Sequence, residues 1–323
     1  MFRCLRVVQP TIRSQLVSLH SQCLNQIRHS SHQAAKQSKV TISTIAKLHS
    51  TQSKITMLTA YDYISAKIAD SSGVDIVLVG DSLAMASLGY DDTNEIPFDE
   101  FLYHCRAVSR GVERAFVVAD LPFGSYESSV AQAVESSIAL VSKGRANAVK
   151  LEGGKEICAT VRRLTELGIP VCGHIGLTPQ RANALGGFKS QGKSVQNAIR
   201  LYEDALALQE AGCFSMVVEA VPSELAELIT EKLDVPTIGI GAGPHTSGQV
   251  LVQTDMLGFL GPDAHTPKFV KRYADGFGTC VDAVKQYVKD VQEVSFPEMG
   301  KNTYKVKEDV LSGFKEYLKS QEK

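Results

Sequence analysis

The chain has 323 residues, of which 44% are hydrophobic and 21% are charged, an ordinary composition for one large globular domain or two small ones. Its net charge of −1 gives no sign of nucleic-acid binding, and no apolar run approaches the length of a transmembrane helix. Seven cysteines are scattered without a CxxC pair, which favours reduced thiols over a disulfide framework or a zinc site.

The first 61 residues differ from the rest of the chain in charge. They contain eight Lys and Arg and no acidic residue, whereas the remainder holds 26 basic and 35 acidic residues. Apolar residues such as Phe2, Leu5 and Val8 lie between the basic ones, as in an amphipathic mitochondrial presequence. We expect a presequence over residues 1–45 and a location in the mitochondrial matrix. A basic arm that binds nucleic acid is the alternative, but no basic stripe interleaved with aromatic residues supports it.

From residue 54 onward, short apolar runs alternate with longer helical patterns, which is typical of βαβ units and a parallel sheet. The predicted strands are residues 55–60, 75–80, 115–119, 147–152, 170–174, 214–219, 236–240 and, more weakly, 256–260. Eight strand–helix repeats over roughly 240 residues predict a closed (βα)8 TIM barrel. We place this α/β barrel at residues 46–295, with an extension at each end. A doubly wound open sheet is the alternative.

Two segments fall outside the repeat. Residues 175–193 form a long connection rich in Gly, Gln and Asn that could be a lid. The tail, residues 296–323, ends in an amphipathic pattern that includes Val310, Phe314 and Leu318. Such a pattern predicts a helix packed against another surface, and we assign it no chemistry.

Polar residues terminate most of the predicted strands, at the end where TIM barrels carry their reacting groups. Asp81 and Ser82 follow the second strand, Asp120 the third, His174 the fifth and Glu219 the sixth. An Asp after a strand is often a helix N-cap, and capping alone could explain Asp81 or Asp120. Such coincidences at consecutive strand ends are much less probable than a shared site.

The fourth strand adds two more charges to the same end of the barrel. Strand alternation puts Lys150 and Glu152 on the inner face, because Val149 and Leu151 should face the helices. Like charges about 4 Å apart repel by roughly 4 kcal/mol at an effective dielectric of 20. A divalent cation would offset this repulsion, and an all-oxygen set of ligands favours Mg²⁺ or Mn²⁺ over zinc. His174 is more readily interpreted as a substrate-binding or orienting residue than as a zinc ligand.

A glycine-rich segment follows the seventh predicted strand. Residues 238–243, IGIGAG, resemble a dinucleotide-binding loop but lack the full GxGxxG spacing. Glycines at a barrel mouth more readily let a flat ring lie against the backbone.

Six motifs at the strand ends can be compared together with known families. They are VGDSL (79–83), ADLPF (119–123), VKLEGG (149–154), CGHIGLTPQ (172–180), EAVP (219–222) and IGIGAG (238–243). In this order they closely resemble the ketopantoate hydroxymethyltransferase family of the phosphoenolpyruvate/pyruvate barrel superfamily. The resemblance extends from Lys54 past Phe269 and leaves out the basic start and the tail.

The resemblance implies transfer of a hydroxymethyl group from 5,10-methylenetetrahydrofolate to 3-methyl-2-oxobutanoate, with Mg²⁺, in pantothenate synthesis. Asp81 and Asp120 would bind the metal, with Glu152 bound directly or through water, and Glu219 would accept the proton. The residues expected to hold the keto acid are Asp81, Ser82, Asp120, Lys150 and His174. Gly241 and Gly243 would lie at the folate mouth. Family members form symmetric homo-oligomers, which makes a ring of ten subunits plausible.

The implied chemistry agrees with the positions deduced from the strands. A 2-oxo acid can chelate Mg²⁺ through carboxylate and keto oxygens, which stabilises the enolate formed when the C3 proton leaves. Lys150 would add positive charge beside that oxyanion. Two alternatives remain: a metal-dependent aldolase or lyase that acts on a pyruvate-like 2-oxo acid without folate, and a catalytically inactive barrel that serves as an assembly component.

Overall fold

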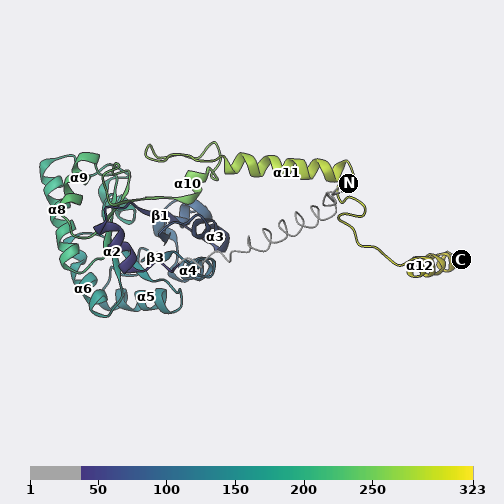
Figure 1. The fold of residues 1–323 in the computed structure, drawn as a ribbon, viewed down its shortest axis with the longest axis horizontal. Helices are drawn as coiled ribbons and strands as arrows, with labels where there is room; N and C mark the ends of the chain where they lie inside the picture. Colours follow the sequence, from purple (N-terminus) through teal and green to yellow (C-terminus); the bar gives the residue numbers. More distant parts are fainter. Residues whose placement is uncertain (1–37, 323) are drawn as a thin grey trace, which may run out of the picture.

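The computed structural model describes residues 38–322, and its centre is a closed barrel of eight parallel strands in chain order (Figure 1). Each strand pairs with the next, and the last pairs with the first through Ile55 and Gly248. The strands are β1 (Ile55–Thr59), β2 (Ile76–Val79), β3 (Phe116–Asp120), β4 (Ala148–Glu152), β5 (Val171–Gly176), β6 (Ser215–Glu219), β7 (Thr237–Ile240) and β8 (Gly248–Leu251). The predicted closed (βα)8 barrel is therefore confirmed.

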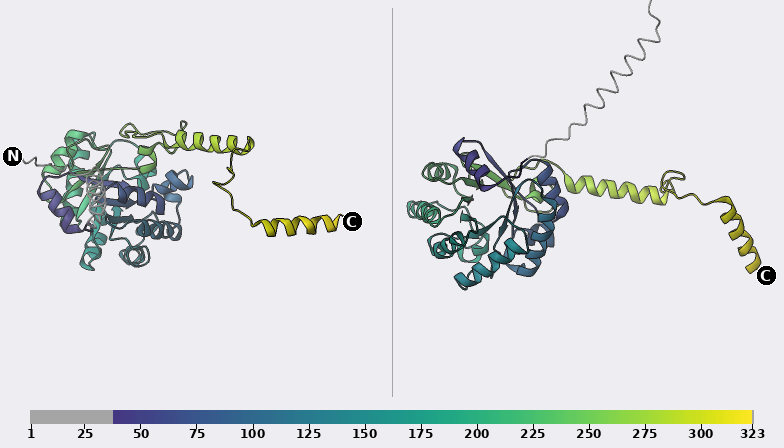
Figure 2. Two further views of the ribbon diagram at one scale, coloured as in Figure 1. Left: turned by 45° about the vertical axis from the view of Figure 1, so that its right-hand side comes forward. Right: turned by 60° about the horizontal axis from the view of Figure 1, so that its bottom comes forward.

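Helices surround the barrel and connect most of its strands (Figure 2). They are α2 (Ile42–Ser50), α3 (Tyr63–Ser71), α4 (Phe98–Gly111), α5 (Val130–Ser142), α6 (Cys158–Glu166), α7 (Ala182–Leu185), α8 (Val195–Glu210), α9 (Ser223–Glu231) and α10 (Gln253–Leu257). Local capping fixes where several of them begin. The side chains of Asp62, Ser129 and Ser194 accept hydrogen bonds from backbone N–H groups in the first turns of α3, α5 and α8.

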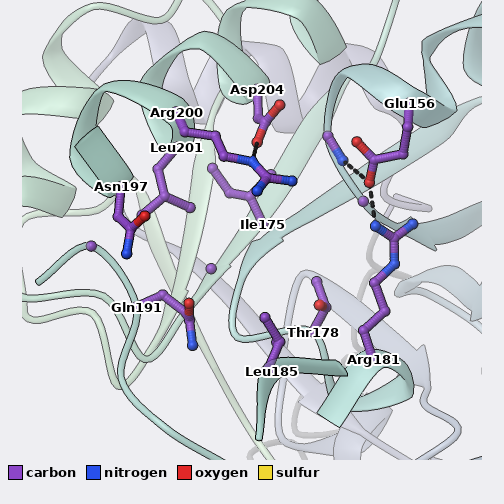
Figure 3. A pocket seen from close by; sticks show the side chains of 14 residues that line it. Glu156, Ile175, Thr178, Arg181, Leu185, Gln191, Asn197, Arg200, Leu201 and Asp204 are labelled. Carbon is purple, nitrogen blue, oxygen red and sulfur yellow. Dashed lines mark hydrogen bonds and ion pairs between the residues drawn. The ribbon is translucent and has the colours of Figure 1, made fainter. Parts of the chain in front are cut away.

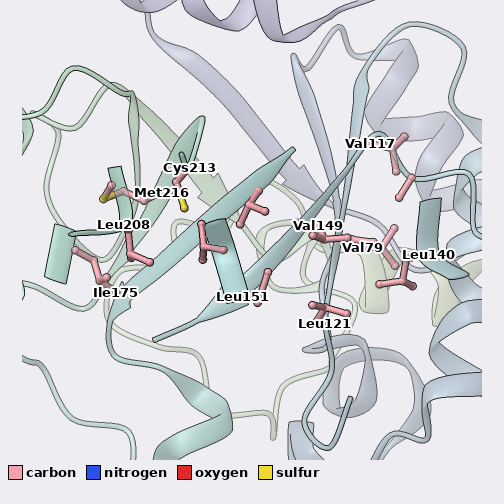
Figure 4. Packing of buried hydrophobic residues seen from close by; sticks show 14 of the residues in the cluster. Val79, Val117, Leu121, Leu140, Val149, Leu151, Ile175, Leu208, Cys213 and Met216 are labelled. Carbon is pink, nitrogen blue, oxygen red and sulfur yellow. The ribbon is translucent and has the colours of Figure 1, made fainter. Parts of the chain in front are cut away.

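Alternation along the strands divides the core into an inner and an outer part. Met57, Val118 and Val217 belong to the cluster inside the barrel. Val149 and Leu151 belong to the larger cluster between the strands and the helices, which Figure 4 shows, as their pattern predicted. Inner positions on the same strands are left for polar side chains near the carboxyl end, where the barrel mouth opens.

Residues before 46 also contribute to the barrel core. Val40 and Ile45 are 2% and 1% exposed and pack in the inner cluster. The N–H group of Val40 also donates to the carbonyl of Arg114, 2.8 Å away. The rest of the predicted presequence, residues 1–37, lies outside the described residues.

The eighth strand was predicted wrongly at residues 256–260. These residues lie at the end of α10 and beyond it, while the strand is the shorter and less apolar β8. Pairing on both sides defines this strand. Its neighbour β1 comes so close that a Cβ atom at Gly248 would collide with the carbonyl oxygen of Ile55.

No helix separates β7 from β8, contrary to the prediction of eight complete repeats. Each of these strands has four residues and rises only about 13 Å. The loop at residues 241–247 can return over that height because seven extended residues reach about 24 Å.

Two further helices lie outside the barrel. α11 (Gly276–Gln292) and α12 (Glu308–Gln321) contain no buried residue and extend away from the barrel (Figures 1 and 2). α11 thus lies within the predicted range 46–295, and α12 lies within the predicted tail. α12 confirms the helix predicted in the tail, but it packs against no other part of the described chain. No helix among residues 38–322 is both long and apolar enough to cross a membrane.

Candidate active site

The predicted polar residues converge at the carboxyl ends of strands β2 to β6. Asp120 and Lys150 are direct partners in the register of β3 and β4, and both are buried. The Lys150 Nζ atom lies 2.9 Å from Asp120 Oδ1. Since a charge buried without a partner is costly, each of these side chains stabilises the charged form of the other.

His174 lies between two of the predicted carboxylates. Its Nδ1 atom is 3.3 Å from Glu152 Oε1, and its Nε2 atom is 3.2 Å from Glu219 Oε2. Glu152 and His174 are partners in the register of β4 and β5, whereas Glu219 ends β6. The imidazole therefore lies between Glu219, whose side chain is 14% exposed at the mouth, and the more deeply buried Glu152.

The protonation of His174 follows from these contacts. Burial and the nearby Lys150 ammonium oppose a positive charge, but Glu152 and Glu219 outweigh them and raise the pKa of His174 to about 9. Nδ1 also lies 3.3 Å from Lys150 Nζ, a contact that is a hydrogen bond only with the neutral ring. We favour the protonated ring, because it forms an ion pair with each glutamate, at 3.3 Å from Glu152 and 3.2 Å from Glu219.

Asp81 follows β2 and lies beside the other acids. Its backbone N–H group donates to Asp120 Oδ2 over 3.0 Å, and its Oδ2 atom accepts a 2.7 Å hydrogen bond from Gln180 Nε2. Burial, followed by repulsion from Asp120 and Glu152, raises the pKa of Asp81 well above its usual range. This carboxyl group therefore lacks a neighbouring positive charge sufficient to balance its own.

Lys150 and Glu152 differ from Asp81, because their surroundings favour the charged form of each side chain. Burial would lower the pKa of Lys150, but Asp120, Glu152 and Asp81 together raise it. Burial would raise the pKa of Glu152, but His174 and Lys150 hold it below its usual range. Both side chains are thus charged at neutral pH.

Ser82 lies close to the backbone of Gly80 at the end of β2. A Cβ atom at Gly80 would lie 3.1 Å from Ser82 Oγ and 3.7 Å from Asp120 Oδ2. The missing side chain therefore lets the Ser82 hydroxyl lie close to the end of this strand, and the substrate-binding role of Ser82 stays a prediction.

Gly241 and Gly243 are explained by packing within the chain. Both have positive φ, at 63° and 77°, a conformation that glycine adopts most readily. A Cβ atom at Gly241 would lie 2.8 Å from Phe269, and one at Gly243 would collide with Ser223. These contacts account for both glycines without a folate ring, so the role predicted for them stays a prediction.

The three predicted metal ligands do not form a closed coordination site as they stand. Among the described residues 38–322, no three His, Cys, Asp or Glu side chains are arranged to hold a metal ion. Asp120 contacts Lys150, Glu152 contacts His174, and Asp81 contacts Gln180 instead. The donor chemistry nevertheless suits a hard cation, because all three side chains offer carboxylate oxygens.

A cavity of about 130 Å³ lies beside the end of β4, where Gly153 and Gly154 line it (Figure 3). It lies between the end of β5 and α8, and its lining includes Ile175 and Leu201. Arg181 pairs with Glu156 on its wall, and Arg200 Nε lies 3.7 Å from Asp204 Oδ2. The paired charges leave this cavity close to neutral.

Sequence reasoning missed Gln180 and Tyr126. Gln180 was part of the CGHIGLTPQ motif but received no role, and no pattern singled out Tyr126. The signal available for Gln180 was its place after Thr178 and Pro179, since proline in the first turn of a short 3-10 helix, η4 (Pro179–Arg181), fixes the backbone there.

The fold and the site together define a class of protein. A closed parallel barrel whose charged side chains meet at the carboxyl ends of its strands is a TIM-barrel enzyme.

Comparisons with known proteins give the family. A model of the family described as ketopantoate hydroxymethyltransferase matches residues 39–299. A 3-methyl-2-oxobutanoate hydroxymethyltransferase of Emericella nidulans is 50% identical over 313 residues, which cover 95% of this chain and 89% of that protein. One from Thermoanaerobacter sp. is 50% identical over 260 residues, which cover 80% of this chain and 94% of that protein. The chain belongs to the ketopantoate hydroxymethyltransferase family and is an enzyme of that family.

Solved structures of lower sequence identity share the fold. Phosphonopyruvate hydrolase in complex with oxalate and Mg²⁺ has a TM-score of 0.54 at 14% identity, covering 86% of this chain and 96% of that one. For 2,3-dimethylmalate lyase the TM-score is 0.51 at 14% identity, covering 81% and 91%. At this identity the likeness concerns the barrel alone.

Proposed function

We propose that the protein transfers a hydroxymethyl group from 5,10-methylenetetrahydrofolate to 3-methyl-2-oxobutanoate, which yields ketopantoate and tetrahydrofolate in pantothenate synthesis. Family membership supports this reaction. The observation that carries it is the Glu219 carboxylate, held 3.2 Å from His174 Nε2 at the mouth, close to the buried pair of Lys150 and Asp120. A base next to a fixed positive charge suits proton removal beside a carbonyl.

We further propose that Asp81, Asp120 and Glu152 hold Mg²⁺, or Mn²⁺ in its place. With Glu219 they make four carboxylates against the two positive charges of Lys150 and His174, an excess of two negative charges that a divalent cation would balance. Burial, followed by repulsion from Asp120 and Glu152 within that excess, raises the pKa of Asp81. When bound, the cation would withdraw electrons from the keto oxygen and so acidify the C3 proton.

Each side chain at the barrel mouth then has a separate role in the reaction. Glu219 accepts the C3 proton, and His174 keeps its carboxylate aimed at the mouth. Lys150 stabilises the negative charge that develops on the keto oxygen. The C3 carbon forms a bond to the methylene carbon of the donor, whose two bonds to folate nitrogens break. One water supplies the hydroxyl oxygen, and the C3 proton and one proton of this water end on the two folate nitrogens. Ser82 binds the keto acid beside Gly80.

Proton exchange tests this proposal. In D2O with Mg²⁺, the protein should exchange the C3 proton of 3-methyl-2-oxobutanoate, followed by NMR, whereas Glu219→Gln should lose at least about a hundredfold in rate. Glu227→Gln on α9, at a half-exposed carboxylate outside the site, is the matched control. Equal exchange in the wild type and Glu219→Gln would exclude Glu219 as the base. Ketopantoate formation only with the folate donor would exclude an aldolase or lyase.

The location and the assembly are also proposals. We propose import into the mitochondrial matrix, supported by the acid-free basic start of the chain. Residues 1–45 fused to a fluorescent protein should direct it to mitochondria, and a cytosolic signal would overturn the proposal. We propose a symmetric homo-oligomer of ten subunits on the family resemblance, and sedimentation velocity measures its mass.

A further inference from the structure

Gln180 connects two of the carboxylates that are proposed to hold the cation. Its side-chain Nε2 atom donates to Asp81 Oδ2 over 2.7 Å, and its backbone N–H group donates to Glu152 Oε2 over 3.1 Å. The residue is only 4% exposed. One residue of the connection after β5 thus fixes an oxygen on each of two acids that come from different strands.

The orientation of the Gln180 amide is determined by its surroundings. Nε2 also donates to the carbonyl of Leu121 over 2.9 Å, while Oε1 accepts a 2.6 Å hydrogen bond from the Tyr126 hydroxyl. A flipped amide would place its oxygen against the Asp81 carboxylate and the Leu121 carbonyl, where it would be repelled. The backbone carbonyl of Gln180 accepts from Asn94 Nδ2 over 3.0 Å. Every polar group of this residue is therefore engaged.

These bonds have a consequence for the acids themselves. A hydrogen bond to a carboxylate oxygen favours the charged form, and the Gln180 contact acts in that direction on Asp81 against burial and like charges. It also fixes which oxygen of Asp81 is occupied and which one remains for another partner. Neutral donors of this kind orient metal ligands and strengthen metal binding in many sites.

We infer that Gln180 is a positioning residue: it orients Asp81 and Glu152 for cation binding, and Tyr126 holds its amide in the required orientation. This inference rests on the proposed function, because it assumes that these carboxylates bind a divalent cation. Gln180 touches no reacting atom in this scheme. Its effect is transmitted through the two carboxylates, from the connection after β5 to the site.

Binding of Mn²⁺ tests the inference without reference to activity. The free Mn²⁺ signal in electron paramagnetic resonance gives the Kd of the full chain directly. Gln180→Met keeps a similar volume and the backbone N–H donor to Glu152 but removes the side-chain donor to Asp81, and it should weaken Mn²⁺ binding by about ten- to a hundredfold. Tyr126→Phe removes a hydroxyl that donates to Gln180 Oε1 and, over 3.2 Å, to the backbone carbonyl of Glu152, and it should weaken Mn²⁺ binding by about two- to tenfold. It also provides a readout if Gln180→Met does not fold.

The matched control is Gln191→Met, on the same connection. The Gln191 side chain donates only to the nearby carbonyl of Lys189, over 2.9 Å, and should leave the Mn²⁺ affinity unchanged. Circular dichroism and thermal melting establish that each variant is folded before its affinity is compared.

Proton exchange measured against Mg²⁺ concentration separates positioning from a general structural defect. Gln180→Met should raise the Mg²⁺ concentration for half-maximal exchange and recover most of the rate at saturation, whereas Glu219→Gln should lose the rate and keep its Mn²⁺ affinity. Unchanged Mn²⁺ affinity in Gln180→Met and Tyr126→Phe would overturn the inference and leave the proposed function intact. No Mn²⁺ binding by the wild type would overturn the proposed metal, and the inference with it.

Discussion

Lys150 and Asp120 form a buried ion pair across neighbouring strands, with Nζ 2.9 Å from Oδ1 and both residues at most 4% exposed. Their partnership in the β3–β4 register makes the contact a direct consequence of strand pairing. The pair lies at the mouth of the barrel, so it contributes both to folding and to the electrostatics of the site.

Replacing Lys150 by Met should destabilise the protein by about 3–5 kcal/mol, because Asp120 is left buried without its charged partner. The double variant with Asp120→Asn should recover part of this loss, since the unpaired charge is then gone. Urea unfolding measures both effects. Lys155→Met, at an exposed pair with Glu203, is the control and should change stability little. Equal losses at the two lysines would contradict a buried-charge penalty.

The stability of the metal-free protein should fall as pH rises from about 6.5 to 9. The pKa of His174 is raised from 6.5 to about 9, so its contribution is complete below pH 6.5 and is lost as pH passes 9. The contribution reaches about 3 kcal/mol. Urea unfolding with EDTA at pH 6, 7.5 and 8.5 measures the slope.

His174→Gln should remove most of that pH dependence, whatever its effect on stability at one pH. The range ends at pH 8.5 because buried thiols such as Cys172, whose pKa is raised to about 11, add their own loss above pH 9. An equal slope in the variant would show that another group titrates.

Gly80→Ala should impair substrate binding more than folding. The added methyl group would lie 3.1 Å from Ser82 Oγ and displace this proposed substrate-binding hydroxyl. We expect the KM for the keto acid to rise by at least about tenfold, and stability to change by less than about 1.5 kcal/mol. Gly313→Ala, at an open position in α12, is the matched control and should leave KM unchanged. An unchanged KM in Gly80→Ala would argue against substrate at this position.

A chain that begins at residue 46 should be less stable than one that begins at residue 38. The longer chain keeps Val40 and Ile45, which are buried in the barrel. Burial of two such side chains stabilises by roughly 3–6 kcal/mol. The urea midpoints of the two chains provide the comparison. Equal midpoints would show that α2 adds nothing to the barrel.

Much of the fold was predictable because its rules are local or nearly so. Apolar runs located seven of the eight strands, and alternation placed Lys150 and Glu152 inside the barrel. β8 could not be found in this way, because Gly248 and Gln249 make it less apolar than the neighbouring residues 256–260. This strand is defined by its pairing with β1 and β7, and these contacts between distant residues form only when the barrel closes.

The residues of the site were likewise only partly predictable from the sequence. Residues that end strands could be anticipated, since parallel strands bring their carboxyl ends together. Gln180 and Tyr126 reach the site from the connections after β5 and β3, and connection paths carry no periodic signal. The contacts of His174 with Glu152 and Glu219 likewise depend on side-chain geometry that strand positions do not specify.

The raised pKa of Asp81 has a consequence for laboratory selection. Above the usual pKa of an aspartate, a buried carboxylate repelled by Asp120 and Glu152 lowers the stability of the metal-free fold. Asp81→Asn removes that repulsion, and it also removes a proposed ligand oxygen. A screen for heat resistance in the absence of divalent cations would therefore enrich inactive variants that carry a substitution at Asp81. A screen under catalytic conditions would instead retain Asp81, at a cost in stability.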